Sequence, residues 1–187
     1  MKILRSVTQQ FMQSSSPKVP TGFQQIARVK VGGQMFMPIL YWLLIALVLY
    51  IVSKKTVFGR HVFAVGSNEK TSRLSGINVN RVKLGVYALM GAVVAIAAVL
   101  QVSRIGAMDP ANAGSGYELD SIAAVIVGGT SMSGGKGSVV GTVFGMLIIA
   151  VMNNLLNLLG VPPFLREAFK GAIIIAAVLL QRKSSDN

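Results

Sequence analysis

The sequence predicts an all-α membrane protein, a polytopic helix bundle of about five spans that include one short or broken segment. Apolar residues make up 52% of the 187-residue chain and charged residues only 13%, about half the charged share of an average soluble domain. The mean hydropathy is +0.62. The apolar residues are also gathered into long runs separated by basic segments, which is how cations flank membrane spans.

The charge balance and the residue types exclude several classes of function. The chain has 18 Lys and Arg against 6 Asp and Glu, a formal net charge of +12. A basic soluble protein would suggest nucleic acid, but these cations lie between apolar runs, so we expect a lipid membrane and no nucleic acid as partner. The chain has no cysteine and a single histidine, His61, so we expect no metal site. Because no catalytic constellation is present either, we expect neither a cofactor nor an enzyme activity.

The first apolar run defines the first span. Residues 1–35 are expected to be polar and irregular, without a visible signal peptide. Residues 36–53 then form an almost uninterrupted apolar run, which as a helix would cover about 27 Å at 1.5 Å per residue. This length nearly matches the apolar core of a bilayer.

A hydrophilic segment follows at residues 54–83. It contains seven Lys and Arg but a single acid, Glu69, so the positive-inside rule places it in the cytoplasm. Within it, residues 68–75 could form a short amphipathic helix, capped by Asn68 and ended by Gly76. Two interpretations stay open: a solvated basic loop, or a docking helix for a cytoplasmic partner.

Four apolar segments make up the rest of the chain. Three of them are expected to be spans, at residues 84–102, 139–159 and 169–180. The segment at 121–127 is too short to cross alone, so it either re-enters the membrane or belongs to a broken span. If it crosses, the N-terminus lies outside and the C-terminus inside. The pair Pro162-Pro163 is expected to separate the last two spans.

Small and polar residues within the apolar segments suggest contacts between helices. Gly137, Gly141 and Gly145 recur every four residues, which lets another helix approach closely; ordinary packing is one interpretation and a role in gating the other. Asn153 and Asn157 are one helical turn apart and share a face. Amides in hydrocarbon need partners, so these two either form interhelical hydrogen bonds or line a polar pathway.

Two acids and a glycine-rich run surround the short apolar segment. Glu118 and Asp120 precede it without a second catalytic group, so we expect structural capping at a helix N-terminus rather than acid–base chemistry. The run at residues 128–137 is not a phosphate-binding loop, because the required glycine and the residue after the lysine are both wrong. Broken helices at membrane depth often mark transport sites, and the residues placed at this break are Gly128, Gly129, Thr130 and Ser131.

Several long motifs, all in the same order, resemble the permease subunits of ribose-type sugar ABC importers. The resemblance covers roughly residues 36–183, with 184–187 left as a tail, and includes only the C-terminal half of such permeases. It is carried by Phe58-Gly59-Arg60, Ala64-Val65-Gly66-Ser67-Asn68-Glu69, Arg73-Leu74-Ser75-Gly76-Ile77-Asn78-Val79, residues 116–125, Gly128-Gly129-Thr130-Ser131, Gly134-Gly135-Lys136-Gly137, residues 153–161 and Lys170-Gly171-Ala172.

The resemblance implies a non-catalytic permease subunit in a bacterial inner membrane. Its expected partners are a second permease subunit, a cytoplasmic ABC ATPase that hydrolyses ATP, and an extracytoplasmic sugar-binding protein. The matching ATPase-coupling loop contains Gly66, Asn68, Glu69, Arg73, Leu74 and Gly76. The region matching the translocation pathway contains Glu118, Asp120, Gly128, Gly129, Thr130 and Ser131, to which Asn153 and Asn157 are added.

Length is where the chain departs from that family, whose members are almost twice as long. Residues 1–35 would correspond to the outer loop between the two halves of a full permease. This leads us to expect a truncated or split chain, with a separately encoded N-terminal half as a possible partner. The alternative is an independent small membrane channel or scaffold, against which the long cytoplasmic segment argues.

Overall fold

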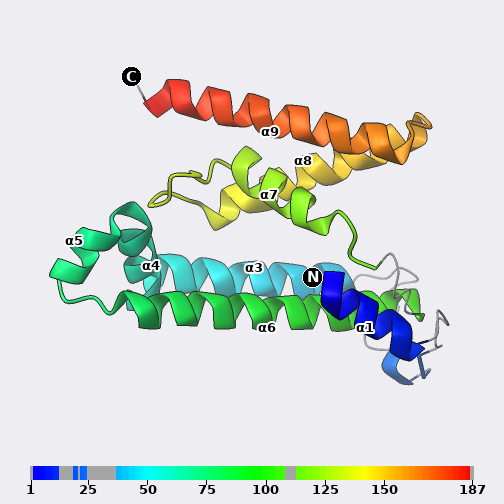
Figure 1. Cartoon of the computed structure of the whole chain (residues 1–187), viewed down its shortest axis with the longest axis horizontal. Helices are drawn as coiled ribbons and strands as arrows, with labels where there is room; N and C mark the ends of the chain where they lie inside the picture. The colour runs from blue at the N-terminus through cyan, green and yellow to red at the C-terminus, as the bar shows by residue number, and fades with distance from the viewer. Residues whose placement is uncertain (1, 13–18, 21, 25–36, 108–112, 186–187) are drawn as a thin grey trace. The chain divides into compact units, whose positions relative to one another are not determined.

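The computed structural model describes the chain except for residues 1, 13–18, 21, 25–36, 108–112 and 186–187 (Figure 1). The chain divides into two compact units. The first comprises residues 1–45 and 85–115, and the second comprises residues 46–84 and 116–187.

The described part of the chain is helical and contains no strand. This confirms the predicted all-α class. In chain order the helices are α1 (Lys2–Met12), α3 (Met37–Lys55), α4 (Val57–Ser67), α5 (Glu69–Leu74), α6 (Val79–Ile105), α7 (Tyr117–Val127), α8 (Val139–Leu158) and α9 (Pro163–Ser185).

Three of the described helices, α3, α6 and α8, are long and apolar enough to cross a membrane. They coincide with the apolar runs expected at residues 36–53, 84–102 and 139–159. Helix α3 has no buried residue, so its apolar side chains need lipid or another protein chain around them. Helix α6 begins earlier than expected because Asn78 caps it, with Oδ1 accepting a hydrogen bond of 3.2 Å from the Arg81 N–H.

In the first unit, the N-terminal segment is attached to the last turn of α6. The buried Ser103 hydroxyl donates a hydrogen bond of 2.8 Å to the carbonyl oxygen of Phe23. The Val19 N–H donates one of 3.2 Å to the carbonyl oxygen of Gly106. The expected irregular structure of residues 1–35 is wrong for α1, where apolar residues at positions 4, 7 and 11 have helical spacing. Residues 13–18 and 25–36 lie outside the described part.

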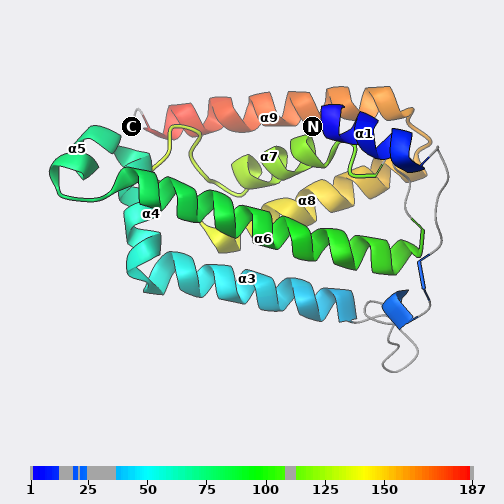
Figure 2. The same cartoon turned by 60° about the horizontal axis from the view of Figure 1, so that its bottom comes forward.

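In the second unit, a sharp bend leads from α3 into α4. The Thr56 hydroxyl donates a hydrogen bond of 2.6 Å to the Val52 carbonyl oxygen and accepts one of 3.1 Å from the Gly59 N–H. A Cβ on Gly59 would overlap the backbone of Ser53. The segment at residues 54–83 is therefore mostly helical, being α4, α5 and the start of α6, rather than the loop that its polarity suggested (Figure 2).

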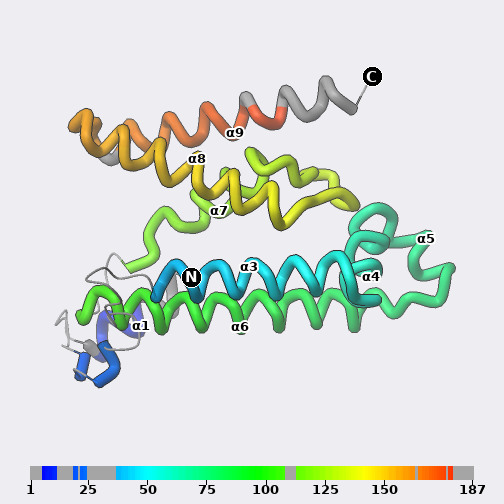
Figure 3. Tube along the Cα trace, turned by 180° about the vertical axis from the view of Figure 1, so that it is seen from behind, coloured from blue at the N-terminus to red at the C-terminus, as the bar shows by residue number. Residues whose placement is uncertain are grey.

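The second unit also contains a bundle in which α7 packs against both α8 and α9 (Figures 1 and 3). Its buried core consists of Ala123, Ala124 and Ile149, against which the partly buried Val127, Met152 and Ile174 pack. Helix α7 has 11 residues and rises about 16 Å, roughly half of a bilayer core. The chain then turns back at residues 128–138 into α8.

Helix α9 follows α8 after a short turn. It begins at Pro163, which confirms the predicted boundary at Pro162-Pro163. It is nevertheless longer than the span expected at residues 169–180. Lys170, near the start of that expected span, lies within α9.

Candidate functional site

Helix α5 is a separate short helix with well-defined ends. The Asn68 Oδ1 caps its N-terminus by accepting a hydrogen bond of 3.0 Å from the Thr71 N–H. At its C-terminus, Gly76 has a φ of 81°, and its N–H binds the Arg73 carbonyl oxygen while the Ile77 N–H binds that of Ser72. This is the usual glycine-terminated helix end. Both predicted ends of this helix are confirmed.

Glu69 ties α5 to the first turns of α6. Its Oε1 accepts a hydrogen bond of 2.8 Å from Arg73 Nη2, and its Oε2 accepts one of 2.7 Å from Lys83 Nζ. These two cations, Lys83 more than Arg73, hold the pKa of Glu69 below its ordinary value. The sequence analysis placed Glu69 and Arg73 in the expected ATPase-coupling loop but did not include Lys83. The only sequence signal for Lys83 was a charge opposite to that of Glu69, 14 residues away.

Helix α5 also presents an apolar side chain to the outside. Leu74, at its C-terminal end, is 90% exposed, although its neighbours in the helix are polar or charged. Isolated exposed leucines are common on protein surfaces. This one ends a short helix that is fixed by a cap and two ion pairs.

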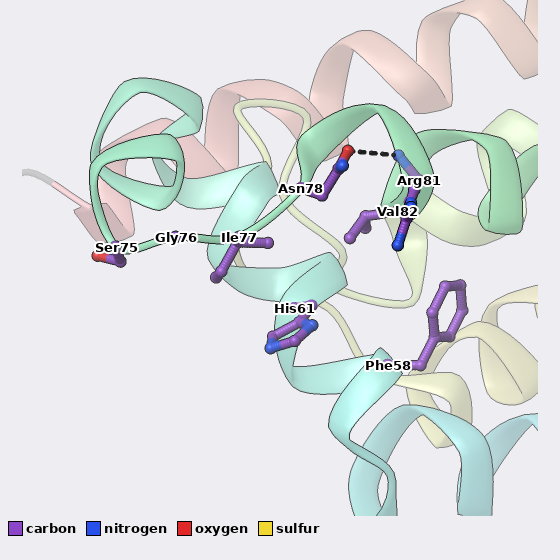
Figure 4. A pocket seen from close by; sticks show the side chains of 8 residues that line it. All are labelled: Phe58, His61, Ser75, Gly76, Ile77, Asn78, Arg81 and Val82. Carbon is purple, nitrogen blue, oxygen red and sulfur yellow. Dashed lines mark hydrogen bonds between the residues drawn. The ribbon is translucent and has the colours of Figure 1, made fainter.

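Two hollows lie beside α5 in the same unit. The larger, about 470 Å³, is lined by Phe58 and His61 from α4, by Arg81 from α6, and by Gly76 and Ile77 between α5 and α6 (Figure 4). The smaller, about 230 Å³, lies between α4 and α5 and shares Ile77 with the first. Together they give this basic segment a concave, partly apolar surface.

The glycine-rich break forms the end of α7 and the turn after it. The Gly129 N–H binds the Ile126 carbonyl oxygen, and the Thr130 N–H binds that of Val125. Gly129 is exposed, whereas Gly128, Thr130 and Ser131 are half-buried. The structure therefore brings these four predicted residues together at one end of α7.

Close contact between α7 and α8 depends on glycine. A Cβ on Gly141 would overlap the Gly128 carbonyl oxygen, and one on Gly145 would overlap that of Ala124. A Cβ on Gly128 would lie 2.5 Å from backbone atoms of Gly141. At Gly137 the nearest atom would be Thr130 Cγ2, at 3.1 Å. The spacing of these glycines allows the two backbones to touch.

A buried polar cluster connects the three helices of this bundle. Lys170 Nζ of α9 forms an ion pair of 2.5 Å with Asp120 Oδ1 of α7, and the two side chains are only 12% and 19% exposed. Asn153 Nδ2 of α8 donates a hydrogen bond of 3.4 Å to Asp120 Oδ2. The interhelical hydrogen bond expected of Asn153 is therefore present. Within the described residues, Asn153 Oδ1 is buried and has no hydrogen-bond donor.

Other predicted polar residues lie differently. Glu118 and Asp120 are in the first turn of α7, but Gly116 is the N-cap and no side chain caps the helix. The expected position of the two acids at a helix N-terminus is therefore confirmed, but neither makes a capping hydrogen bond. Glu118 and Asn157 are exposed, so neither joins the buried cluster. Sequence reasoning missed Lys170 as the partner of Asp120, although a cation at the start of an apolar run was an available signal.

Comparison with known proteins assigns the chain to a family. A family described as "Branched-chain amino acid transport system / permease component" matches residues 3–178. The chain belongs to this permease family. Together with the three long apolar helices, this membership makes it a multi-pass membrane protein.

Individual relatives are named as sugar permeases. The chain is 47% identical over 164 residues to the ribose import permease protein RbsC of Bacillus subtilis. This alignment covers 88% of this chain and 50% of that protein. It is 41% identical over 189 residues to RbsC of Escherichia coli K12, with 98% and 58% covered. It is 46% identical over 141 residues to the xylose transport system permease protein XylH of Haemophilus influenzae, with 75% and 37% covered.

These relatives confirm the resemblance to sugar ABC importer permeases. The chain spans about half the length of these two ribose permeases. No solved structure matches it.

Proposed function

We propose that this chain is a permease component of an ABC importer in a bacterial inner membrane. It forms part of a sugar pathway and is driven by a cytoplasmic ATPase, so it catalyses no covalent chemistry itself. The relatives named above support a sugar as cargo, and since ribose and xylose both have five carbons, a pentose is the first class to test. A second permease subunit and an extracytoplasmic sugar-binding protein would complete the importer.

The proposal of an ATPase partner is supported mainly by helix α5. It lies in the basic segment that the positive-inside rule assigns to the cytoplasm, with Leu74 exposed and two hollows beside it. An apolar tip next to concave surfaces suits protein docking. The Glu69–Lys83 pair gives a direct connection from the docked helix to α6.

The proposed pathway is supported by the break between α7 and α8. Residues 128–131 form a non-helical turn after α7, and at membrane depth such a turn would be tolerated only inside protein or along water. Asp120 and Asn153 add a polar cluster on the same helix pair. We assign to these residues the shaping of the pathway wall, and to the exposed Glu118 and Asn157 direct contact with its contents.

The ATPase partner is tested by exchanging Leu74. The tagged chain would be purified from its native membranes with Leu74→Asp, or with Leu74→Met as the matched control that keeps an apolar tip. We expect ATP hydrolysis to co-purify with the wild type and with Leu74→Met, and to be lost with Leu74→Asp while membrane insertion is unchanged. If the wild type carried no ATP hydrolysis, the independent channel or scaffold would be the better description.

A further inference from the structure

The end of α4 meets the turn between α7 and α8 through three glycines, Gly66, Gly134 and Gly135. A Cβ added to Gly134 would overlap the Gly66 carbonyl oxygen. One added to Gly135 would lie 2.8 Å from Ser67 Cβ, and one added to Gly66 would lie 3.0 Å from the Gly135 nitrogen. All three glycines lie in the second unit. We call this contact the glycine joint.

The glycine joint places backbone directly against backbone. Side chains between two segments can change rotamer and absorb a displacement, whereas close-packed atoms without rotatable groups transmit it. Gly134 and Gly135 have φ values of 85° and 73°, a conformation in which other residues are strained. Both the space and the backbone geometry therefore require glycine on the α7–α8 side.

The turn beyond the glycine joint is held together by its own hydrogen bonds. The Ser131 N–H binds the Lys136 carbonyl oxygen at 3.0 Å, and the Gly134 N–H binds that of Ser131 at 3.1 Å. The Ser138 hydroxyl then caps α8 by accepting from the Gly141 N–H. These bonds link Gly134 through Ser131 to Lys136, two residues before the Ser138 cap of α8.

We propose that Gly66, Gly134 and Gly135 are positioning residues that make α4 and the α7–α8 turn move as one body. Movement imposed on α5 by the ATPase would then reach the break at residues 128–131 through α4. This inference rests on the proposed function, because it needs an ATPase that moves α5. It adds a second route beside the Glu69–Lys83 pair, leading to the pathway helices rather than to α6.

A variant that forces the two backbones apart tests whether movement is transmitted through the glycine joint. Gly134→Ala would separate the two backbones, and Gly160→Ala is its matched control, because Gly160 also has a positive φ of 70° but a Cβ there meets nothing within 4 Å. Both would be compared in proteoliposomes containing the assembled transporter, with sugar uptake and ATP hydrolysis measured together. We expect Gly134→Ala to lower the sugar moved per ATP by roughly five-fold or more, within the usual range of coupling between sites.

The ratio of sugar uptake to ATP hydrolysis distinguishes a loss of transmission from simple damage to the fold. A purely structural role would lower uptake and hydrolysis together and leave their ratio unchanged. An unchanged ratio for Gly134→Ala, or an equal fall for Gly160→Ala, would overturn the inference. Absence of ATP hydrolysis in the wild-type complex would instead overturn the proposed function, so the two failures are distinguishable.

A disulfide tests the geometry without relying on any partner. The chain has no cysteine, so Ser67→Cys with Gly135→Cys introduces the only thiol pair. A small shift brings their Cβ atoms to the spacing of about 3.8 Å that a disulfide needs. We expect mild oxidation of native membranes to protect both thiols from maleimide, whereas Ser67→Cys alone remains reactive.

The same cross-link tests whether the two segments move together. Because they are proposed to form one body, oxidation should leave uptake at the level that the reduced double variant shows. If no cross-link formed, the glycine joint would be refuted. If the cross-link formed and blocked uptake until a reductant was added, the segments would have to move apart during transport, which would refute the one-body movement.

Discussion

Two carboxylates in this chain each bind two side-chain donors, yet their surroundings differ. Glu69, the first residue of α5, binds Arg73 and Lys83, whose side chains are 57% and 50% exposed. Asp120, in α7, binds Lys170 and Asn153, and its ion pair with Lys170 is more than four-fifths buried. The same arrangement of groups therefore occurs once in water and once inside a helix bundle.

The difference shows that an ion pair contributes to the stability of the fold mainly where it is buried, and that an exposed pair mainly holds its helices in position. Exposed ion pairs are worth little, because water and salt screen them. In a buried pair each ion depends on the other, and removing one leaves an uncompensated charge. We therefore expect the α7–α9 bundle to depend strongly on its ion pair, and the α4–α5 region to depend more on its helix ends and glycine contacts.

The largest expected effect comes from removing one partner of the buried pair. Lys170→Met leaves the Asp120 charge without its cation, which costs about 3 kcal/mol or more. The double variant Asp120→Asn with Lys170→Met should recover most of the loss, because Asn at 120 can still bind Asn153. Heating the detergent-solubilised complex and measuring the remaining folded fraction checks both variants. If Lys170→Met were as stable as the wild type, the comparison of the two regions would fail.

A smaller effect is expected from the helix contact in the same bundle. Gly145→Ala would place a methyl group against the Ala124 carbonyl oxygen, and such overpacking costs about 1–3 kcal/mol. Gly91→Ala in α6 is the control, because a Cβ there meets nothing within 4 Å. The same thermal assay should show a lower melting temperature for the first variant only. Equal melting temperatures would mean that α7 and α8 do not approach this closely.

The smallest effect concerns the exposed pair. The pKa of Glu69 is lowered from 4.5, so its stabilising contribution is present above that value and is lost as the pH falls below it. Between pH 6 and 8, α5 should therefore be insensitive to pH. Hydrogen exchange of the α5 amides would check this, with Glu69→Gln as a variant whose ion pairs are absent at every pH. A marked change in exchange between pH 6 and 8 in the wild type would contradict this assignment.

Local signals in the sequence predicted much of the fold. Asn68 and Gly76 marked the ends of α5 because capping depends on neighbouring backbone groups. Long apolar runs marked α3, α6 and α8, and Pro162-Pro163 marked the start of α9. Helices α1 and α4 were missed because polar composition concealed the apolar spacing of α1 and the Thr56 cap that starts α4.

Contacts between distant segments could not be predicted in the same way. The pairing of Asp120 with Lys170 joins residues 50 positions apart, and the glycine joint connects α4 with a turn almost 70 residues later. No periodic pattern in the sequence indicates such contacts. The sequence indicated which residues were unusual for their surroundings, and the three-dimensional arrangement shows which of them meet.

Sugar uptake tests the central claim most directly. In cells that carry the gene for this chain, the gene would be deleted, and ATP-dependent uptake of labelled ribose and xylose would be measured before and after it is restored. We predict that uptake of at least one sugar falls on deletion and returns with the wild-type gene or with Leu74→Met, but not with Leu74→Asp. Unchanged uptake of both sugars after deletion, or full recovery with Leu74→Asp, would contradict the account.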